Sequence, residues 1–436
     1  MLLDGRPLKY RWVIFWTLAI GYLSVHIHRV STAVVAPELV KTFGLSGTLL
    51  GILASTYFYT YAIMQLPMGL LADYFGPRMT ITISLLINCI STILFGISIN
   101  TSMAMFARVL IGFSAAGVFV PTMKIFSEWF SLNEFASAAG ILMAMGGIGW
   151  VLATTPLALL INWLGWRIAF VLIGIILLVI TILTWTLVRN RPSELGWSLI
   201  PDEVVATPEV GIGLIEGLKR VLSEKYIWPL AIRFFFSYGI VIGFGGLWGG
   251  PYLMEIYDLT KTQAGNVLML MALGIIVGSP LLGWLSDKVL MRRKPIIMGS
   301  AFIHCLVWMP LAFWTEKLNL PFLCFLSFMI GVFGSGVSMV ALTASKELFP
   351  KEVTGTSIGL MNIIPFGGAA IIPPFMGYIM DKVGRIAGAY PVNAYKEAFS
   401  FCFILAGIAS IGICFMKETL DRSRGEGVYF SEGIHQ

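Results

Sequence analysis

Long apolar segments separated by short polar loops dominate the chain. A helix of about 20 apolar residues crosses the hydrocarbon core of a bilayer, and in the absence of water its backbone groups bond within the helix. The pattern therefore predicts an all-α membrane protein with twelve transmembrane helices. We place them at 12–36, 48–72, 79–98, 102–126, 135–160, 166–188, 227–252, 262–286, 295–315, 320–345, 353–380 and 394–416.

One long polar connection, 189–226, separates the twelve runs into two groups of six. We therefore expect an N-terminal six-helix bundle at 1–188 and a C-terminal six-helix bundle at 227–436, which ends in a short tail. Within the connection, 212–222 has the pattern of a short amphipathic helix lying on the membrane surface. A simple tether between the two bundles is the alternative.

Composition and charge support the membrane class. The chain is 57% hydrophobic and only 12% charged, with a mean hydropathy of +0.86, whereas soluble chains carry about 25% charged residues. Eighteen Lys and Arg residues fall on the side of the termini and six on the other side. This asymmetry predicts cytoplasmic termini. It also accounts for the net charge of +6 without a nucleic-acid partner.

Two features recur once in each half of the chain. The segments GLLADYFGPR and GWLSDKVLMR each follow an apolar run, and their aspartates, Asp73 and Asp287, lie 214 residues apart. A second pair, Glu128 and Glu347, is separated by 219 residues, and each glutamate precedes a further glutamate and a glycine. Two repeats at nearly one offset indicate a duplicated chain, in which substrate lies between the halves near mid-depth.

The repeated loops predict a conformational gate. Gly69 lets helices approach closely, Gly76 suits a sharp turn, Asp73 can accept hydrogen bonds from a helix N-terminus, and Arg78 can pair with Glu128. Such contacts would hold one side closed and break when it opens. The predicted gating residues are Gly69, Asp73, Gly76, Arg78, Glu128, Gly283, Asp287, Arg292 and Glu347.

These motifs resemble those of the major facilitator superfamily. GLLADYFGPR resembles the loop between its helices two and three, and Arg108 with Gly112 resembles its motif in helix four. Gly165-Trp166-Arg167 is similar to the start of its helix six. The resemblance implies alternating-access transport of a small molecule by a monomer, in the bacterial inner (cell) membrane. The second loop departs from the pattern, because Leu290 stands where glycine is usual.

Basic residues inside the spans are the candidates for ligand chemistry, because an ionisable group in a span is costly. They are Arg29, Arg108, Lys124, Arg167 and Arg233. The last three lie within reach of headgroups, to which long side chains can extend. Arg29 follows Trp12 by 17 residues, about 25 Å along a helix, and lies at or beyond mid-depth.

Arg29 is therefore the leading substrate-binding residue. The segment His26-Ile-His28-Arg29 resembles the first helix of the anion-transporting branches, in which an arginine meets a carboxylate or phosphate. The planar guanidinium binds such oxyanions with two hydrogen bonds. A structural arginine that fixes the first helix to its neighbour is the alternative. For Arg108, a structural or coupling role and direct binding are both open.

Further polar and aromatic residues complete the predicted site. Tyr57 and Tyr61 share one face of the second span, Trp248 lies one repeat offset (219) from Arg29, and Asn362 stands early in the eleventh span. Asp and Glu residues fall only near span ends. His26 and His28 are therefore the candidate proton carriers, although exchange or facilitated diffusion needs none.

These residues predict a secondary transporter of a small organic anion of the carboxylate type, with protons as one option for coupling. Transport of amino acids or other small neutral or zwitterionic solutes is the alternative, and a non-transporting membrane sensor is a third. A phosphate-binding loop, a metal-ligand pattern and a catalytic cluster are not found. We therefore expect no cofactor, no metal and no enzymatic activity.

Overall fold

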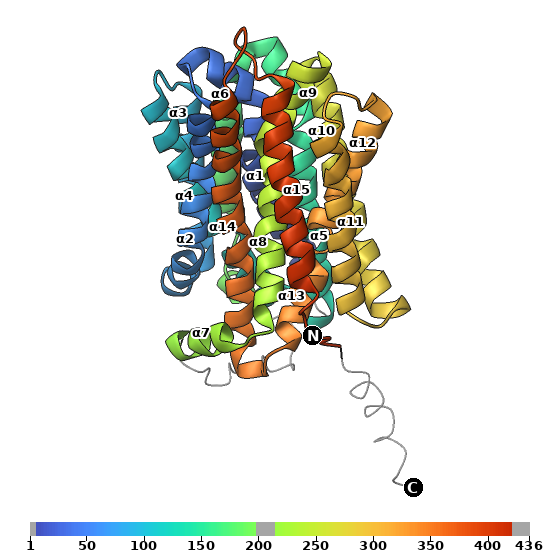
Figure 1. Ribbon diagram of the computed structural model, residues 1–436. Helices are drawn as coiled ribbons and strands as arrows, with labels where there is room; N and C mark the ends of the chain where they lie inside the picture. The colour runs from blue at the N-terminus through green and yellow to red at the C-terminus, as the bar shows by residue number, and fades with distance from the viewer. Residues whose placement is uncertain (1–5, 198–213, 421–436) are drawn as a thin grey trace.

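The computed structural model describes residues 6–197 and 214–420 and shows a bundle of long helices (Figure 1). Strands are not found in these residues; the one extended pairing is the isolated bridge between Ile386 and Ala389. The elements are α1 (Arg6–Phe43), α2 (Gly47–Tyr74), α3 (Pro77–Gly96), α4 (Thr101–Trp129), α5 (Leu132–Leu152), α6 (Thr155–Leu187), η1 (Pro192–Leu195), α7 (Leu214–Ser223), α8 (Ile227–Gly243), η2 (Phe244–Trp248), α9 (Gly249–Tyr257), α10 (Lys261–Trp284), η3 (Leu285–Val289), α11 (Lys294–Phe313), α12 (Leu320–Met329), η4 (Ile330–Ser335), α13 (Ser338–Glu347), α14 (Lys351–Val383) and α15 (Val392–Ile413).

The predicted membrane spans are present. Eleven helices in the described part of the chain are long and apolar enough to cross a bilayer. The remaining predicted span corresponds to α5, whose apolar portion Ser137–Leu152 is shorter. The fold prediction, an all-α membrane protein of two six-helix bundles, is therefore confirmed. We call α1–α6 the N-half and α8–α15 the C-half.

Local sequence sets where several helices begin. Ser46 accepts a hydrogen bond from the backbone N–H of Leu49 at the start of α2, and Asn100 does the same for Met103 in α4. Such caps satisfy N–H groups that have no partner within the helix. Between α2 and α3, Gly76 has a φ of 86°. Pro77 follows as the first residue of α3, where a missing N–H costs nothing.

The helix α6 contains one break. Gly165 has a φ of 76° and a ψ of 158°, which interrupts the helical backbone between Thr155 and Leu187. The continuous helix therefore starts at Trp166, as the predicted span 166–188 requires. The preceding segment, 155–164, begins within the predicted fifth span 135–160 but is a separate short helical stretch after α5.

The C-half differs from the N-half by three π-helical segments. They are η2 in the seventh span, η3 in the eighth and η4 in the tenth, and the described N-half has none. A π-helical turn holds one extra residue and rotates the faces of the helix beyond it. Residues at equal repeat offsets in the two halves therefore need not face the same way.

Both described ends of the chain lie at one end of the bundle (Figure 1). We call this the terminal end, after Arg6 and Leu420, and the other the distal end. The short helix α7 also lies at the terminal end, against α14. It occupies part of the predicted amphipathic segment 212–222; residues 212 and 213 lie outside the described residues.

The second repeated loop is built differently from the first. Asp73 and Pro77 are four residues apart, whereas Asp287 and Pro295 are eight apart. The residue with positive φ is Gly76 in the first loop, at 86°, and Met291 in the second, at 46°. The glycine missing at Leu290 is therefore replaced by a longer loop that turns one residue later.

Candidate functional site

Hydrogen bonds join the two halves at the distal end. Asp381, near the end of α14, accepts from the backbone N–H groups of Gly47 and Thr48, both at 2.7 Å, and from the Thr48 hydroxyl at 2.6 Å. The carboxylate therefore caps the first turn of α2 from the opposite half, where an anion is favoured. Tyr390 donates to the same carboxylate at 2.5 Å. Burial and this hydrogen bond raise the pKa of Tyr390 to about 12, so its hydroxyl keeps its proton.

Other polar contacts strengthen the distal junction. Lys261 of α10 forms an ion pair with Glu38 of α1. The Thr155 hydroxyl donates to Asn266 at 2.6 Å across the same junction. Gly51 lies so close to α14 that an added Cβ would be 2.5 Å from the Cα of Pro374. The distal end is thus closed by both hydrogen bonding and close helix packing.

Polar contacts at the terminal end stay within one half. Arg11 donates two hydrogen bonds of 2.8 Å to Glu134, joining α1 to α5. These hydrogen bonds lower the pKa of Glu134. In the C-half, Arg293 bonds Glu347 at 3.0 Å. Among the described residues, hydrogen bonds between the halves lie on the distal side or at the depth of Arg29, so the halves part toward the terminal end.

Arg29 lies where the halves part. Its side chain is buried, with 8% of its surface exposed. Nη2 donates to the Tyr61 hydroxyl at 2.8 Å, Nε to the Tyr57 hydroxyl at 3.4 Å, and Nη1 lies 3.1 Å from Nε2 of His26. The structure therefore brings four predicted site residues, His26, Arg29, Tyr57 and Tyr61, into one cluster.

Aromatic rings cover one side of this guanidinium. Its carbon lies 4.9 Å from the ring centroid of Tyr61 and 5.1 Å from that of Phe366 in α14. The two centroids are 4.5 Å apart, so both rings lie on the same side. Tyr238 of α8 packs on Phe366, with ring centroids 5.5 Å apart, and its hydroxyl lies near Arg29. Each half therefore contributes rings around one cation, an arrangement that stabilises the positive charge.

The hydrogen bonds of His26 define its role. Nδ1 lies 3.2 Å from the carbonyl oxygen of Tyr22, which can only accept. Nδ1 therefore carries the proton, and Nε2 accepts from Arg29. His26 is a neutral acceptor in this arrangement, because a second proton would point at the guanidinium.

Arg108 and His28 belong to the interior of the N-half. Arg108 donates to the carbonyl oxygens of His28 at 2.9 Å and Ala54 at 3.1 Å, and its guanidinium lies 5.3 Å from the Tyr57 ring centroid. His28 is fully buried and bonds Thr92 of α3 at 3.1 Å. Both residues hold α1 to its neighbours: Arg108 lies over the face of the Tyr57 ring, and His28 is bonded to α3.

Arg233 does not extend to the headgroups, contrary to the expectation from its place near the end of the span. It is buried, with 2% of its surface exposed, and donates to the carbonyl oxygen of Phe333 in η4 at 2.7 Å. Its Nε has no hydrogen-bond partner. The side chain is therefore held within the C-half, because the π-helical segment presents a carbonyl oxygen to it.

Trp248 and Asn362 do not join the Arg29 cluster. Trp248 is fully buried, donates to the carbonyl oxygen of Pro373 at 3.0 Å and packs on Tyr390. In this conformation Trp248, which lies in the π-helical segment η2, therefore packs inside the C-half and does not face the Arg29 cluster. Asn362 is exposed, one helical turn from Phe366 toward the terminal end.

The predicted gate contacts of the first loop are replaced by others. Asp73 pairs with Lys124 at 2.5 Å instead of with a helix N-terminus. Arg78 donates to the carbonyl oxygen of Trp185, and Glu128 is near Arg191, at 3.7 Å. The pair Arg78–Glu128 is therefore not formed, because α6 and the start of the linker lie closer to each partner.

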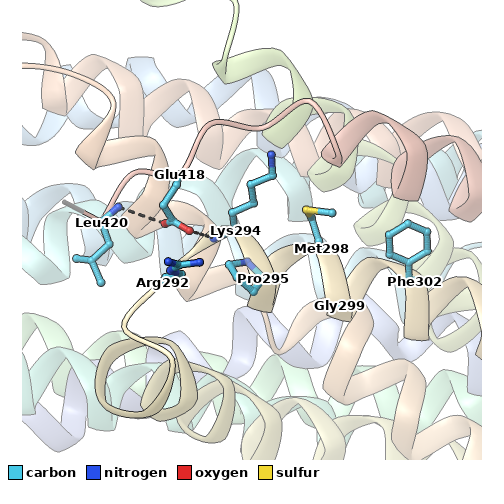
Figure 2. A pocket seen from close by; sticks show the side chains of 8 residues that line it. All are labelled: Arg292, Lys294, Pro295, Met298, Gly299, Phe302, Glu418 and Leu420. Carbon is cyan, nitrogen blue, oxygen red and sulfur yellow. Dashed lines mark hydrogen bonds between the residues drawn. The ribbon is translucent and has the colours of Figure 1, made fainter. Parts of the chain in front are cut away.

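In the second loop the basic residue that forms ion pairs is Arg293, whereas the prediction named Arg292. Arg293 bonds both Asp287 and Glu347. Arg292 is exposed and, with Lys294 and Glu418, lines a surface pocket at the terminal end of α11 (Figure 2). There Glu418 accepts from the backbone N–H of Lys294 at 3.2 Å. This pocket lies within the C-half and is separate from the Arg29 cluster.

Close helix approach at Gly69 and Gly283 is also not found in this conformation. An added Cβ at Gly69 would have its nearest neighbour, Val120, at 4.0 Å, and one at Gly283 would meet nothing within 4 Å. Both glycines lie toward the terminal end, where the halves are apart. The tight approaches are at the distal end instead.

Sequence reasoning missed Phe366, Tyr238 and Asp381. Phe366 follows Asn362 by four residues, so a helical-face argument from Asn362 could have found it. Asp381 stands just beyond the predicted span 353–380, and nothing in its neighbourhood signals a partner 334 residues away in the chain.

Two helical bundles that meet around a buried cation form the architecture of a secondary membrane transporter. The family model of the Major Facilitator Superfamily matches residues 18–250 and 244–429. The chain therefore belongs to this superfamily and is a transporter-type membrane protein, not an enzyme.

Similar proteins extend over nearly the whole chain. A "Probable hexose phosphate transport protein" of Chlamydia trachomatis is 28% identical and covers 92% of this chain and 90% of its own. The "Probable sulfoacetate transporter SauU" of Cupriavidus necator is 26% identical, with 95% and 96% covered. The "Membrane sensor protein UhpC" of Escherichia coli is also 26% identical, with 87% and 88% covered.

A solved structure supports the fold. The bacterial homologue of the human lysosomal transporter Spinster, in an inward-facing and unoccupied conformation, superimposes with a TM-score of 0.76. It covers 93% of this chain and 96% of its own, at 19% identity. At this identity the likeness concerns the fold alone.

Proposed function

We propose that this protein transports small organic anions by alternating access and that Arg29 binds the anionic group. The observation that carries this proposal is the environment of Arg29. Its guanidinium is buried between the halves, and its hydrogen-bond partners are tyrosine hydroxyls and a histidine nitrogen. A carboxylate is not among these partners.

A buried charge without a counter-ion is expensive, and such groups in spans mark substrate pathways. Tyrosine hydroxyls and aromatic faces offset part of this cost. An anion that reaches the cluster would offset much more, because its oxygens form charge-assisted hydrogen bonds with the guanidinium. Two of the three similar proteins have names that contain anionic solutes, hexose phosphate and sulfoacetate, in accord with this proposal.

We further propose that the terminal end faces the cytoplasm, which the excess of Lys and Arg on that side favours. On this assignment the protein is closed outward and open inward. Substrate would reach Arg29 from the cytoplasm here and from outside once the distal contacts break. A monomer is sufficient for this cycle, because both halves belong to one chain.

For energy coupling, we propose that His26 and His28 stay neutral and do not take up and release a coupling proton. His26 accepts a hydrogen bond from Arg29, and His28 is bonded inside the N-half. Exchange of anions or facilitated diffusion accords with these roles. A zwitterionic substrate would bind less favourably, because the described side chains around Arg29 include no carboxylate to pair with its ammonium group. The sensor relative makes signalling without transport the other candidate.

The test is ligand-induced thermal stabilisation of the purified protein, followed by uptake into proteoliposomes. A ligand that binds only the folded state raises the melting temperature by mass action. We expect carboxylates, sulfonates or phosphate esters to stabilise the wild type. Arg29→Lys should weaken binding about tenfold to hundredfold, because it keeps the charge but loses the planar fork.

Arg233→Lys is the matched control, since it alters a buried arginine outside the cluster. Equal loss in both variants would assign Arg29 a structural role. Stabilisation by amino acids or neutral sugars alone would replace the anion proposal. Binding of an anion without uptake would favour the sensor.

A further inference from the structure

We infer that the Arg29 site accepts one negative charge per substrate, so that monoanions are preferred over dianions of the same size. This inference rests on the proposed function and names the substrate class more closely. It comes from counting the charged groups on every element that meets the cluster.

Arg29 is the single charged side chain in that count. From α1 the cluster includes Tyr22 and His26, from α2 Tyr57 and Tyr61, from α8 Tyr238 and from α14 Phe366. The tyrosine hydroxyls are neutral donors, and His26 is neutral because it accepts from the guanidinium. The described side chains around the site therefore carry a net charge of one.

The other buried cations are held elsewhere. Tyr57 meets Arg29 with its hydroxyl, whereas Arg108 lies over the face of the Tyr57 ring. Two nitrogens of Arg108 donate to backbone carbonyls of α1 and α2. Arg233 is held by a carbonyl of η4 inside the C-half. At the distal junction, Lys261 is already paired with Glu38.

The hydrogen-bonding capacity of Arg29 agrees with this count. A guanidinium has five N–H donors, and three of them go to Tyr57, Tyr61 and His26. One N–H on each terminal nitrogen remains, with the Tyr238 hydroxyl nearby, and the pair suits the two oxygens of one carboxylate or sulfonate group. A second charged group on the same substrate would lie among aromatic rings and neutral hydroxyls. Its desolvation would have no compensating partner.

The experiment compares matched ligands on purified full-length protein by calorimetry and thermal shift. The pairs are a six-carbon aldonate with the six-carbon aldarate, and ethanesulfonate with sulfoacetate. We expect the monoanion of each pair to bind at least about tenfold more tightly, since an unpaired buried charge costs more than about 1.4 kcal/mol. Equal or tighter binding of the dianions would overturn the inference and leave the anion proposal intact.

A phosphate monoester supplies a second, independent test. Its second pKa is about 6, so the monoanion fraction rises about thirtyfold between pH 7.5 and pH 5. Apparent affinity for glycerol phosphate should therefore rise as the pH falls, whereas affinity for ethanesulfonate should not change. The opposite trend for the phosphate ester would contradict a single-charge site.

A variant that adds a second positive charge near Arg29 tests the same inference from the opposite direction. Asn362 is exposed and shares the helical face of Phe366, one turn closer to the terminal end. Asn362→Arg adds a second cation beside the site and should narrow or reverse the preference, whereas Asn362→Gln should leave it unchanged. A preference that persists in Asn362→Arg would argue that size, not charge, sets selectivity. Failure of every anion to bind wild type would instead overturn the proposed function.

Discussion

The two ends of the bundle use the same kinds of side chain in opposite ways. At the distal end, Asp381 and Lys261 bond residues of the other half. At the terminal end, Arg11, Asp73 and Arg293 bond residues of their own half. The first set must break for the distal end to open, whereas the second set can persist through the cycle. Location relative to the boundary between the halves, more than charge, therefore decides which contacts join the halves.

The largest shift of the distal equilibrium should come from filling a close helix contact between the halves. Gly51→Val places atoms 2.5 Å from the Pro374 backbone, so the closed distal end should become about tenfold to hundredfold less populated. Spin labels at Lys41 and Ile386, in a background without the native cysteines, would report the distance. We expect it to lengthen. Gly140→Val is the control, because nothing lies within 4 Å of that position; an equal change there would contradict the comparison.

A smaller shift is expected from Asp381→Asn. The amide can accept hydrogen bonds but loses the charge that favours the helix N-terminus, a difference of about 1 kcal/mol. The same label pair should show a minor open population. Asp73→Asn at the terminal end should leave the distal distance unaltered. If Asp73→Asn opened the distal end as much as Asp381→Asn, the two ends would not be distinct.

The smallest effect concerns the Arg11–Glu134 pair, which is partly exposed to solvent on its glutamate side and contributes at most ~1 kcal/mol. Because Arg11 lowers the pKa of Glu134, the contribution is present above the ordinary glutamate value of 4.5 and is lost as the pH falls through the lowered pKa. Melting temperatures of wild type and Glu134→Gln should therefore differ slightly at pH 7 and converge at strongly acidic pH. A difference that grows toward acid would contradict this assignment.

Hydropathy and helical spacing were sufficient for much of the molecule. Apolar run lengths located the spans, including the start of the continuous part of α6 at Trp166. The i+4 spacing of Tyr57 and Tyr61 placed both hydroxyls at Arg29. These features depend on local periodicity, which a single sequence contains.

Partner choice could not be predicted in the same way. Asp381 meets Gly47 across the boundary between halves, and only the three-dimensional packing of α2 on α14 brings them together. A constant repeat offset pairs Trp248 with Arg29, but Trp248 lies in the π-helical segment η2 and is bonded to Pro373 inside the C-half. Arg293 replaces Arg292 because the second loop is longer than the first.

The position of Arg29 at the vertex of the opening has an electrical consequence. The membrane voltage drops mainly across the part of the protein that is closed to water, here the distal junction. On the proposed mechanism, the switch between conformations moves this drop from one side of Arg29 to the other. An empty site then carries one positive charge through the field, worth up to about 2.3 kcal/mol per 100 mV. A site filled by a monoanion carries none, so voltage would act on the return of the empty protein and leave the loaded step unaffected.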